Sequence, residues 1–433
     1  MTPLHQDEYE DPREIKMIKI NRIKATQVRL GAISNQSERI KQSVFGQLHK
    51  EMRLWPGSSF RRSYLGKGHG GQKRAFKVTF MGEGVNDYGG PYRAVFQQIV
   101  DEVQCDTALV GRKTGDKCLL PLLVPCPNRS SAVGANQDKF LLSSAATTPL
   151  SQELMQFFGK ICGTAIRHCM NMGLNLSSML WRPVVGLDIS RAHLATIDVL
   201  AANDMAGVER LGLELEEDGR DEDGKPLDSS YVPNEWVDLN FTVTTADGSR
   251  VSLLPKGTEL QVNLGNWREY LRLVERYRLR ESTVMYRALC DGLSAVIPTE
   301  LFPIFTPTEL EQLMCGSTAV DINLLRQCTE YDDISPDSTL VKFFWEVLEE
   351  MTDDERTLFL RFVWARSRMP ASAQAEAHPD DYLPHAQTCF FSLSLPPYSS
   401  KEVLRQKILY AINNSPNMDA DVRLHNADGW ADS

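Results

Sequence analysis

Apolar residues recur at helical spacing in several stretches of the chain, and these stretches predict most of its regular structure. Helices are expected over Glu38–Met52 and from Leu150 to about Met170. Thr306-Pro307-Thr308-Glu309 predicts a further helix start, because threonine caps, proline fits the first helical position and glutamate closes a capping box. That helix is expected to stop at Gly316. Strict alternation over Phe76–Phe80 predicts a strand.

The last hundred residues show a second set of helical patterns. A helix is expected over Leu340–Met351, and a capping box at Thr352 and Glu355 opens the next one. A Pro- and Ala-rich connection follows at Met369–His378, and then a strand-like run at Cys389–Leu395. The final helix is expected to start at Ser399, with Glu402 as its box partner.

Two polar stretches interrupt these patterns. Residues 214–230 are strongly acidic and nearly free of core-forming side chains, so we expect a solvated loop there. Thr329–Ser338 is rich in Asp, Ser and Pro, which favour turns over helices. The pattern therefore predicts a large N-terminal lobe, a hinge and a smaller C-terminal lobe.

Composition narrows the class of protein without choosing a function. The 433 residues are 42% hydrophobic, which suits two or three domains. Asp and Glu number 57 against 47 Lys and Arg, so binding to nucleic acid by phosphate neutralisation is not expected. The longest apolar run, Cys118–Cys126, is too short to span a bilayer. Nine cysteines without C-x-x-C spacing indicate reduced thiols and a cytoplasmic protein.

Two local motifs are interpreted as structural. Gly66–Gly71 matches a G-x-G-x-x-G pattern, but a strand-like segment follows it where a dinucleotide site needs a helix, so we expect a flexible basic loop. Cys162, His168 and Cys169 lack the spacing of a zinc site. No metal or cofactor is therefore expected.

The segment Leu383–Phe391, "LPHAQTCFF", carries the sharpest chemical signal. A cysteine at the start of an apolar strand is usually a buried packing residue. His385 is close to Cys389 in sequence, whereas the Cys–His pair of a protease is normally distant and needs a third, orienting group. A cysteine hydrolase therefore stays open as an alternative without support of its own.

The segment 383–412, "LPHAQTCFFSLSLPPYSSKEVLRQKILYAI", resembles the end of HECT ubiquitin ligases. Three upstream segments resemble the same family in the same order: 80–96 "FMGEGVNDYGGPYRAVF", 304–316 "IFTPTELEQLMCG", and 329–370, which begins "TEYDD". The likeness is greatest to the giant HERC-type ligases. It implies an α+β bilobal fold, with a large mainly helical N-lobe carrying a small inserted subdomain, a hinge and a smaller α/β C-lobe.

The resemblance also implies boundaries within the chain. Residues 1–75 would be an upstream linker or helical extension, 76–331 the N-lobe, 332–338 the hinge and 339–433 the C-lobe. The inserted subdomain, about 192–262, would dock a ubiquitin-conjugating enzyme. The docking residues implied by the resemblance are Leu200, Leu211, Met285, Tyr286 and Leu289.

The implied reaction is transfer of ubiquitin. Cys389 would take ubiquitin from the conjugating enzyme as a thioester, and a lysine of a protein substrate would then attack it. Thr388 would lie beside the reacting sulfur, and Trp430 matches the family's tail aromatic. Family members often carry a histidine directly before the Thr-Cys pair, where this chain has Gln387, and His385 is two positions away.

The expected partners are ubiquitin, a conjugating enzyme and protein substrates, with no nucleic acid and no integral membrane segment. Peripheral membrane association through regions outside this chain is left open. An adaptor that binds the conjugating enzyme without catalysis is the second alternative.

Overall fold

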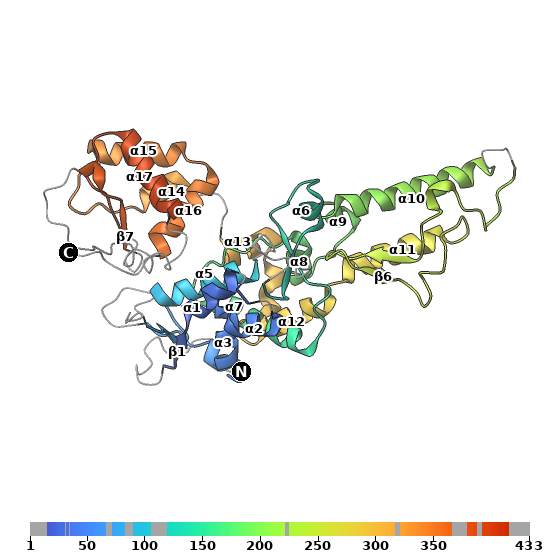
Figure 1. Cartoon of the computed structure of the whole chain (residues 1–433), viewed down its shortest axis with the longest axis horizontal. Coiled ribbons are helices and arrows are strands. Elements are labelled where there is room, and N and C mark those ends of the chain that lie inside the picture. Colours follow the sequence, from blue (N-terminus) through green and yellow to red (C-terminus); the bar gives the residue numbers. More distant parts are fainter. Residues whose placement is uncertain are drawn as a thin grey trace, which may run out of the picture. The chain divides into compact units, whose positions relative to one another are not determined.

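The structure is a computed structural model of the chain (Figure 1). It describes residues 15–30, 32–33, 35–65, 72–82, 90–104, 119–220, 225–316, 321–365, 379–387 and 392–414. These residues divide into two compact units. The first takes in the described residues of Ile23–Arg62 and Gln97–Cys315, and the second takes in those of Asp7–Arg22, Ser63–Phe96 and Gly316–Ser433. Each unit is described by itself.

Helices account for most of the regular structure. The α-helices are α1 (Arg22–Arg29), α2 (Gln36–Gln42), α3 (Val44–Met52), α4 (Gly57–Phe60), α5 (Gly90–Val103), α6 (Pro127–Ser131), α7 (Pro149–Arg167), α8 (Ser178–Val184), α9 (Arg191–Ala195), α10 (Val199–Asp218), α11 (Trp267–Arg280), α12 (Thr283–Ser294), α13 (Pro307–Cys315), α14 (Ile322–Gln327), α15 (Thr339–Glu350), α16 (Asp353–Ala365) and α17 (Lys401–Asn414). Short 3₁₀ helices are η2 (Asn234–Trp236), η3 (Thr299–Ile304) and η4 (Pro379–Asp381).

The strands form two-stranded sheets. They are β1 (Met17–Ile20), β2 (Lys77–Phe80), β3 (Leu123–Pro125), β4 (Phe140–Leu142), β5 (Thr242–Thr244), β6 (Arg250–Ser252), β7 (His385–Gln387) and β8 (Ser392–Ser394). Strand β1 pairs with β2 in parallel, whereas β3–β4, β5–β6 and β7–β8 are antiparallel. Strand β2 confirms the strand predicted around Phe76–Phe80.

The first unit is built around α7 and α12, which pack closely because each carries glycine at the contact. A Cβ on Gly159 would lie 2.3 Å from the carbonyl oxygen of Leu289, and one on Gly292 would lie 2.0 Å from that of Gln156. Only a residue without a side chain fits these two positions. Helix α7 confirms the helix predicted from Leu150.

The upstream segment is helical and packs onto α7. The rings of Phe45 and Phe60 lie 5.3 and 6.2 Å from the ring of Phe157. The helix predicted over Glu38–Met52 is two helices, because Ser43 ends α2 and its side chain caps α3.

The buried carboxylate of Glu102, on α5, caps the same end of α3. It accepts hydrogen bonds from the backbone N–H groups of Val44 at 2.7 Å and Phe45 at 2.8 Å. Burial raises the pKa of Glu102 to about 7, although both hydrogen bonds favour the ionised form.

Helices α9, α10 and α11 and the β5–β6 hairpin enclose a core that contains Trp236, Phe241 and Trp267 and that continues to Val124 on β3 and Leu141 on β4. Helix α10 runs to Asp218, so the prediction of a loop over 214–230 is wrong for its first five residues. Glutamate is a good helix former, and Glu216 accepts a hydrogen bond from Trp267 Nε1 at 3.1 Å. The helix ends where Gly219 takes a positive φ of 63°.

The second unit has a separate apolar core supplied by α15, α16 and α17. Its most buried side chains are Val347, Leu348, Leu404 and Ile408. The predicted capping box is confirmed, because Thr352 N–H donates to Glu355 at 2.8 Å and Glu355 N–H donates to the Thr352 hydroxyl at 3.2 Å. The final helix is capped one residue later than predicted, by Ser400 rather than Ser399.

The two units alternate along the chain up to Phe96, and the last boundary between them falls between Cys315 and Gly316. Thr306 and Glu309 form the predicted capping box of α13, and Gly316 adopts a φ of 80° after that helix. Tyr331 and Ile334 pack against the core of the second unit.

None of the helices in the described part of the chain is both long enough and apolar enough to traverse a bilayer.

Candidate functional site

Strands β7 and β8 flank the predicted nucleophile in the sequence. His385 is the Cα partner of Ser394, and Gln387 is the partner of Ser392. The pairing therefore brings together the backbone on either side of residues 388–391. Thr388 and Cys389 lie outside the described residues, and so does Trp430.

Hydrogen bonds join the segment before β7 to the segment after β8. The Tyr398 hydroxyl donates to the carbonyl oxygen of Tyr382 at 3.0 Å. Asp380 accepts from the backbone N–H of Ser399 at 2.8 Å and from the hydroxyl of the same residue. Burial, with a smaller contribution from Asp380, raises the pKa of Tyr398, so its hydroxyl stays protonated and available as a donor.

The subdomain formed by α9–α11 and β5–β6 carries part of the predicted docking set. Leu200, in the first turn of α10, is 46% exposed. Leu211, three turns later, is half-buried against the subdomain core. Leu213, Val237 and Leu260 also expose their side chains here, and the sequence analysis did not single them out. Periodicity along α10 gives no such signal, because apolar residues occur on both its inner and outer faces.

Two of the three predicted docking residues on helix α12 are not accessible to a partner. Met285 and Leu289 are 1% and 3% exposed, because they belong to the buried side of α12 that packs on α7. Their assignment to a docking surface is therefore corrected. Tyr286 is half-buried, and its pKa is raised chiefly by burial and also by a hydrogen bond with Cys290.

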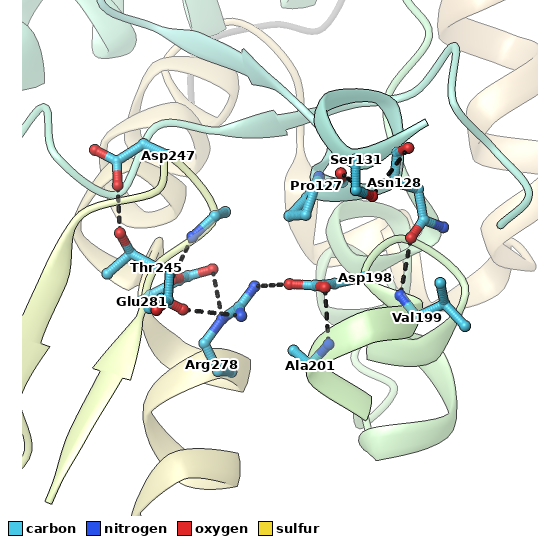
Figure 2. Close-up of polar contacts among 12 residues, drawn as sticks. Pro127, Asn128, Ser131, Asp198, Val199, Ala201, Thr245, Asp247, Arg278 and Glu281 are labelled. Carbon is cyan, nitrogen blue, oxygen red and sulfur yellow. Dashed lines mark hydrogen bonds and ion pairs between the residues drawn. The ribbon is translucent and has the colours of Figure 1, made fainter. Parts of the chain in front are cut away.

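Asn128, on α6, holds the chain at the start of α10 (Figure 2). Its side chain accepts from the backbone N–H of Val199 at 2.8 Å and donates to the carbonyl oxygens of Ala135 and Thr196 at 2.8 and 3.2 Å. Asn136 donates to the same Thr196 oxygen at 3.0 Å. Asn128 is only 1% exposed, so these bonds satisfy its polar atoms inside the protein.

Arg278, near the end of α11, lies between two carboxylates (Figure 2). Its Nη2 is 2.8 Å from Asp198 Oδ2, its Nε is 3.4 Å from Glu281 Oε1, and its Nη1 donates to the Thr244 carbonyl oxygen at 3.0 Å. Asp198 also caps α10 through the N–H of Ala201. Burial raises the pKa of Glu281, although the charge of Arg278 acts in the opposite direction.

Cys162 and His168, two of the residues considered for a zinc site, have structural roles instead. Cys162 is buried in α7, and burial raises its pKa well above the usual value. The Nε2 atom of His168 is 2.8 Å from the carbonyl oxygen of Arg62. Across the described ranges, no group of three or more His, Cys, Asp or Glu side chains could hold a metal ion.

Comparisons with known proteins match the chain to one family. The family model described as HECT-domain (ubiquitin-transferase) matches residues 117–421. The chain is 34% identical over 392 residues to the human E3 ubiquitin-protein ligase HERC2, covering 88% of this chain and 7% of that protein. It is 27% identical over 372 residues to the probable human E3 ubiquitin-protein ligase HECTD4, covering 78% of this chain and 9% of the relative. HACE1 of Danio rerio is 27% identical over 291 residues, which is 63% of this chain and 30% of that ligase.

Proposed function

Because the chain belongs to the HECT family of ubiquitin transferases, we propose that it accepts ubiquitin as a thioester on Cys389 and passes it to a lysine of a protein substrate. One observation carries this proposal. The Thr-Cys-Phe segment with Cys389 lies inside the matched residues 117–421 and between two strands that pair with each other. The chain spans 7% of the length of HERC2, so substrates and partners of a longer protein are part of the proposal.

In the proposed reaction the Cys389 thiolate attacks the carbonyl carbon of the ubiquitin thioester on the conjugating enzyme. A new C–S bond forms, the old one breaks, and the conjugating enzyme leaves as a thiolate. A neutral lysine amine of the substrate then attacks the new thioester, loses a proton to solvent and releases the Cys389 thiolate. Thioester exchange joins bonds of the same kind, so correct placement of the reactants supplies most of the acceleration.

We assign supporting roles to residues near Cys389 and at the chain end. Thr388 would donate a hydrogen bond to the reacting sulfur or carbonyl oxygen. His385 lies three residues before Thr388 on β7 and would lie near the reaction centre, without replacing the histidine that many family members have at the Gln387 position. Trp430 would anchor the tail during transfer to lysine.

The separate apolar core of α15–α17 supports a second lobe at 339–433. We propose a first lobe at 76–331 that is joined to the upstream residues 1–75, with movement between the lobes, although residues 7–22 and 63–96 group with the second compact unit. The proposed hinge at 332–338 is best tested together with Gly316, because the last boundary between the compact units along the chain lies there. The proposed docking surface for the conjugating enzyme lies within about 192–262 and uses Leu200 and Leu211, with Tyr286 beside it.

We also propose that the chain works in the cytoplasm. The cysteines of the described residues are free thiols, among them the exposed Cys169 and Cys328, and such thiols persist in a reducing compartment. Fractionation of cells that express a tagged chain tests this location.

The decisive experiment mixes the chain with activating enzyme, a panel of conjugating enzymes, ATP and fluorescent ubiquitin, and separates the products on non-reducing gels. The proposal expects a thiol-sensitive adduct that Cys389→Ala removes. Cys328→Ala is the matched control, because Cys328 is exposed and should leave the adduct unchanged. If no member of the panel gives an adduct although one binds, the chain is an adaptor. Release of free ubiquitin without an acceptor lysine would indicate a hydrolase.

A further inference from the structure

We propose that Asn128, Asn136 and Arg278 are positioning residues for ubiquitin transfer. They fix the direction of α10, and they do so without contributing to the affinity of that helix for a conjugating enzyme. This inference rests on the proposed function, because α10 belongs to the proposed docking subdomain. The residues that hold the start of α10, namely Asn128, Asn136, Asp198, Arg278 and Glu281, are called the α10 anchor below.

The α10 anchor holds four successive residues that lead into the helix, Thr196–Val199, the last two being its N-cap and its first residue. The carbonyl oxygen of Thr196 accepts from both asparagine side chains, and that of Ile197 accepts from the backbone N–H of Asn128 at 3.0 Å. The Asp198 carboxylate binds Arg278, and the N–H of Val199 donates to Asn128. Because the chain is held at these four consecutive residues, the helix that follows has little freedom to tilt at its first turn.

Arg278 extends this hold to α11 and to the turn between β5 and β6. Its guanidinium joins Asp198 on α10 to Thr244 on β5, and Glu281 in turn accepts from the N–H of Ala246 at 3.3 Å. The side chain of Arg278 is 2% exposed, so its charge is matched inside the protein by the two carboxylates. The anchor therefore sets α10 and α11 together.

The length of α10 turns a small change at the anchor into a large one at its far end. The helix has 20 residues, which corresponds to about 30 Å at the usual helical rise. A tilt of about 10° at the first turn would therefore displace the last turn by about 5 Å. Misplacing reacting groups by about 1 Å can already slow a reaction about a hundredfold.

The packing within the subdomain is separate from this anchor. Arg191, on α9, pairs with Glu209 on α10 and with Glu275 on α11. The aromatic side chains of Trp236, Phe241 and Trp267 fill the subdomain core. Asn136→Gly removes none of these contacts, so the surface that would meet a conjugating enzyme is expected to stay in place. Placement of the bound thioester is then disturbed more than binding itself.

The test measures single-turnover formation of the Cys389 thioester from a conjugating enzyme charged with fluorescent ubiquitin, over a range of charged-enzyme concentrations. The conjugating enzyme is the one that discharges fastest onto the unmodified full chain. Asn136→Gly removes the bond to Thr196 from an exposed residue and keeps its φ of 57°, which glycine adopts without strain. Arg278→Lys keeps the buried charge but loses the planar fork that reaches three partners.

Both variants should lower the maximal rate about tenfold and leave the half-saturating concentration of charged enzyme within about twofold of the unmodified value. Gln137→Ala and Arg272→Gln are matched controls, because these side chains bond within their own loop and helix, and both should load at the unmodified rate. Thermal melting by circular dichroism checks that each variant is folded.

An unchanged maximal rate in folded Asn136→Gly would overturn the positioning role. A variant whose only change is a higher half-saturating concentration of charged enzyme would overturn it as well. An unmodified chain that never loads ubiquitin would overturn the proposed function instead. The two failures are therefore distinguishable in one experiment.

Discussion

Replacing Glu102 by glutamine should remove one source of pH dependence from the stability of the first unit. The carboxyl group of Glu102 has a pKa of about 7 in the folded protein, against 4.5 for an ordinary glutamate. Between these two pH values the unfolded chain releases this proton and the folded chain retains it. The contribution of Glu102 to stability is therefore fully present below pH 4.5 and is lost as the pH rises through 7.

The size of this effect follows from the difference between the two pKa values. One pKa unit corresponds to about 1.4 kcal/mol, so the whole window is worth about 3 kcal/mol. Glutamine stays neutral throughout. Its single carbonyl oxygen can replace only one of the two carboxylate oxygens that accept from Val44 and Phe45, and the cost of the lost hydrogen bond does not change with pH. Between pH 4.5 and 7.5 the free energy of unfolding of the unmodified chain should therefore fall by about 3 kcal/mol relative to that of Glu102→Gln.

Urea unfolding followed by far-ultraviolet circular dichroism, at constant ionic strength and several pH values, measures this difference. Glu51→Gln is the matched control, because Glu51 is exposed on α3, the helix that Glu102 caps. Parallel pH profiles for the unmodified chain and Glu102→Gln would refute the reasoning, since they would show that Glu102 titrates alike in the folded and unfolded states.

Three further outcomes are expected. Gly292→Val should lower the free energy of unfolding by about 3 kcal/mol by overpacking the α7–α12 contact, while Gly173→Ala, with open space around it, should have little effect on urea unfolding. Tyr398→Phe should cost about 1 kcal/mol in thermal unfolding, because it removes the hydroxyl that donates to Tyr382. Deleting Trp430–Ser433 should spare thioester loading and slow lysine transfer in a pulse-chase gel assay, and equal transfer would contradict the role of the tail.

Local chemistry could be predicted well from the sequence. Thr306 with Glu309 and Thr352 with Glu355 start helices where expected, because a capping box depends on residues only three apart. The parallel pairing of β1 with β2 joins residues 17–20 to 77–80, and no local pattern specifies such a partner.

The exposure of apolar residues on helices shows the same limit. Met285 and Leu289 are buried and Leu213 is exposed, although all three are apolar residues in helices. Periodicity groups apolar residues onto one face, but the neighbouring elements decide whether that face is covered. For Met285 and Leu289 the cover is α7, whose glycines allow α12 to approach closely.

The contact of Phe45 and Phe60 with Phe157 has a practical consequence for dissecting the protein. A fragment starting at residue 76, where the resemblance places the first lobe, would lose two aromatic rings that pack on α7. It would also lose β1, the partner of β2. Such a fragment would present an apolar face of α7 and an open strand edge to solvent, two features that promote aggregation during expression. A fragment beginning near residue 15 retains both the aromatic contacts and the strand pairing.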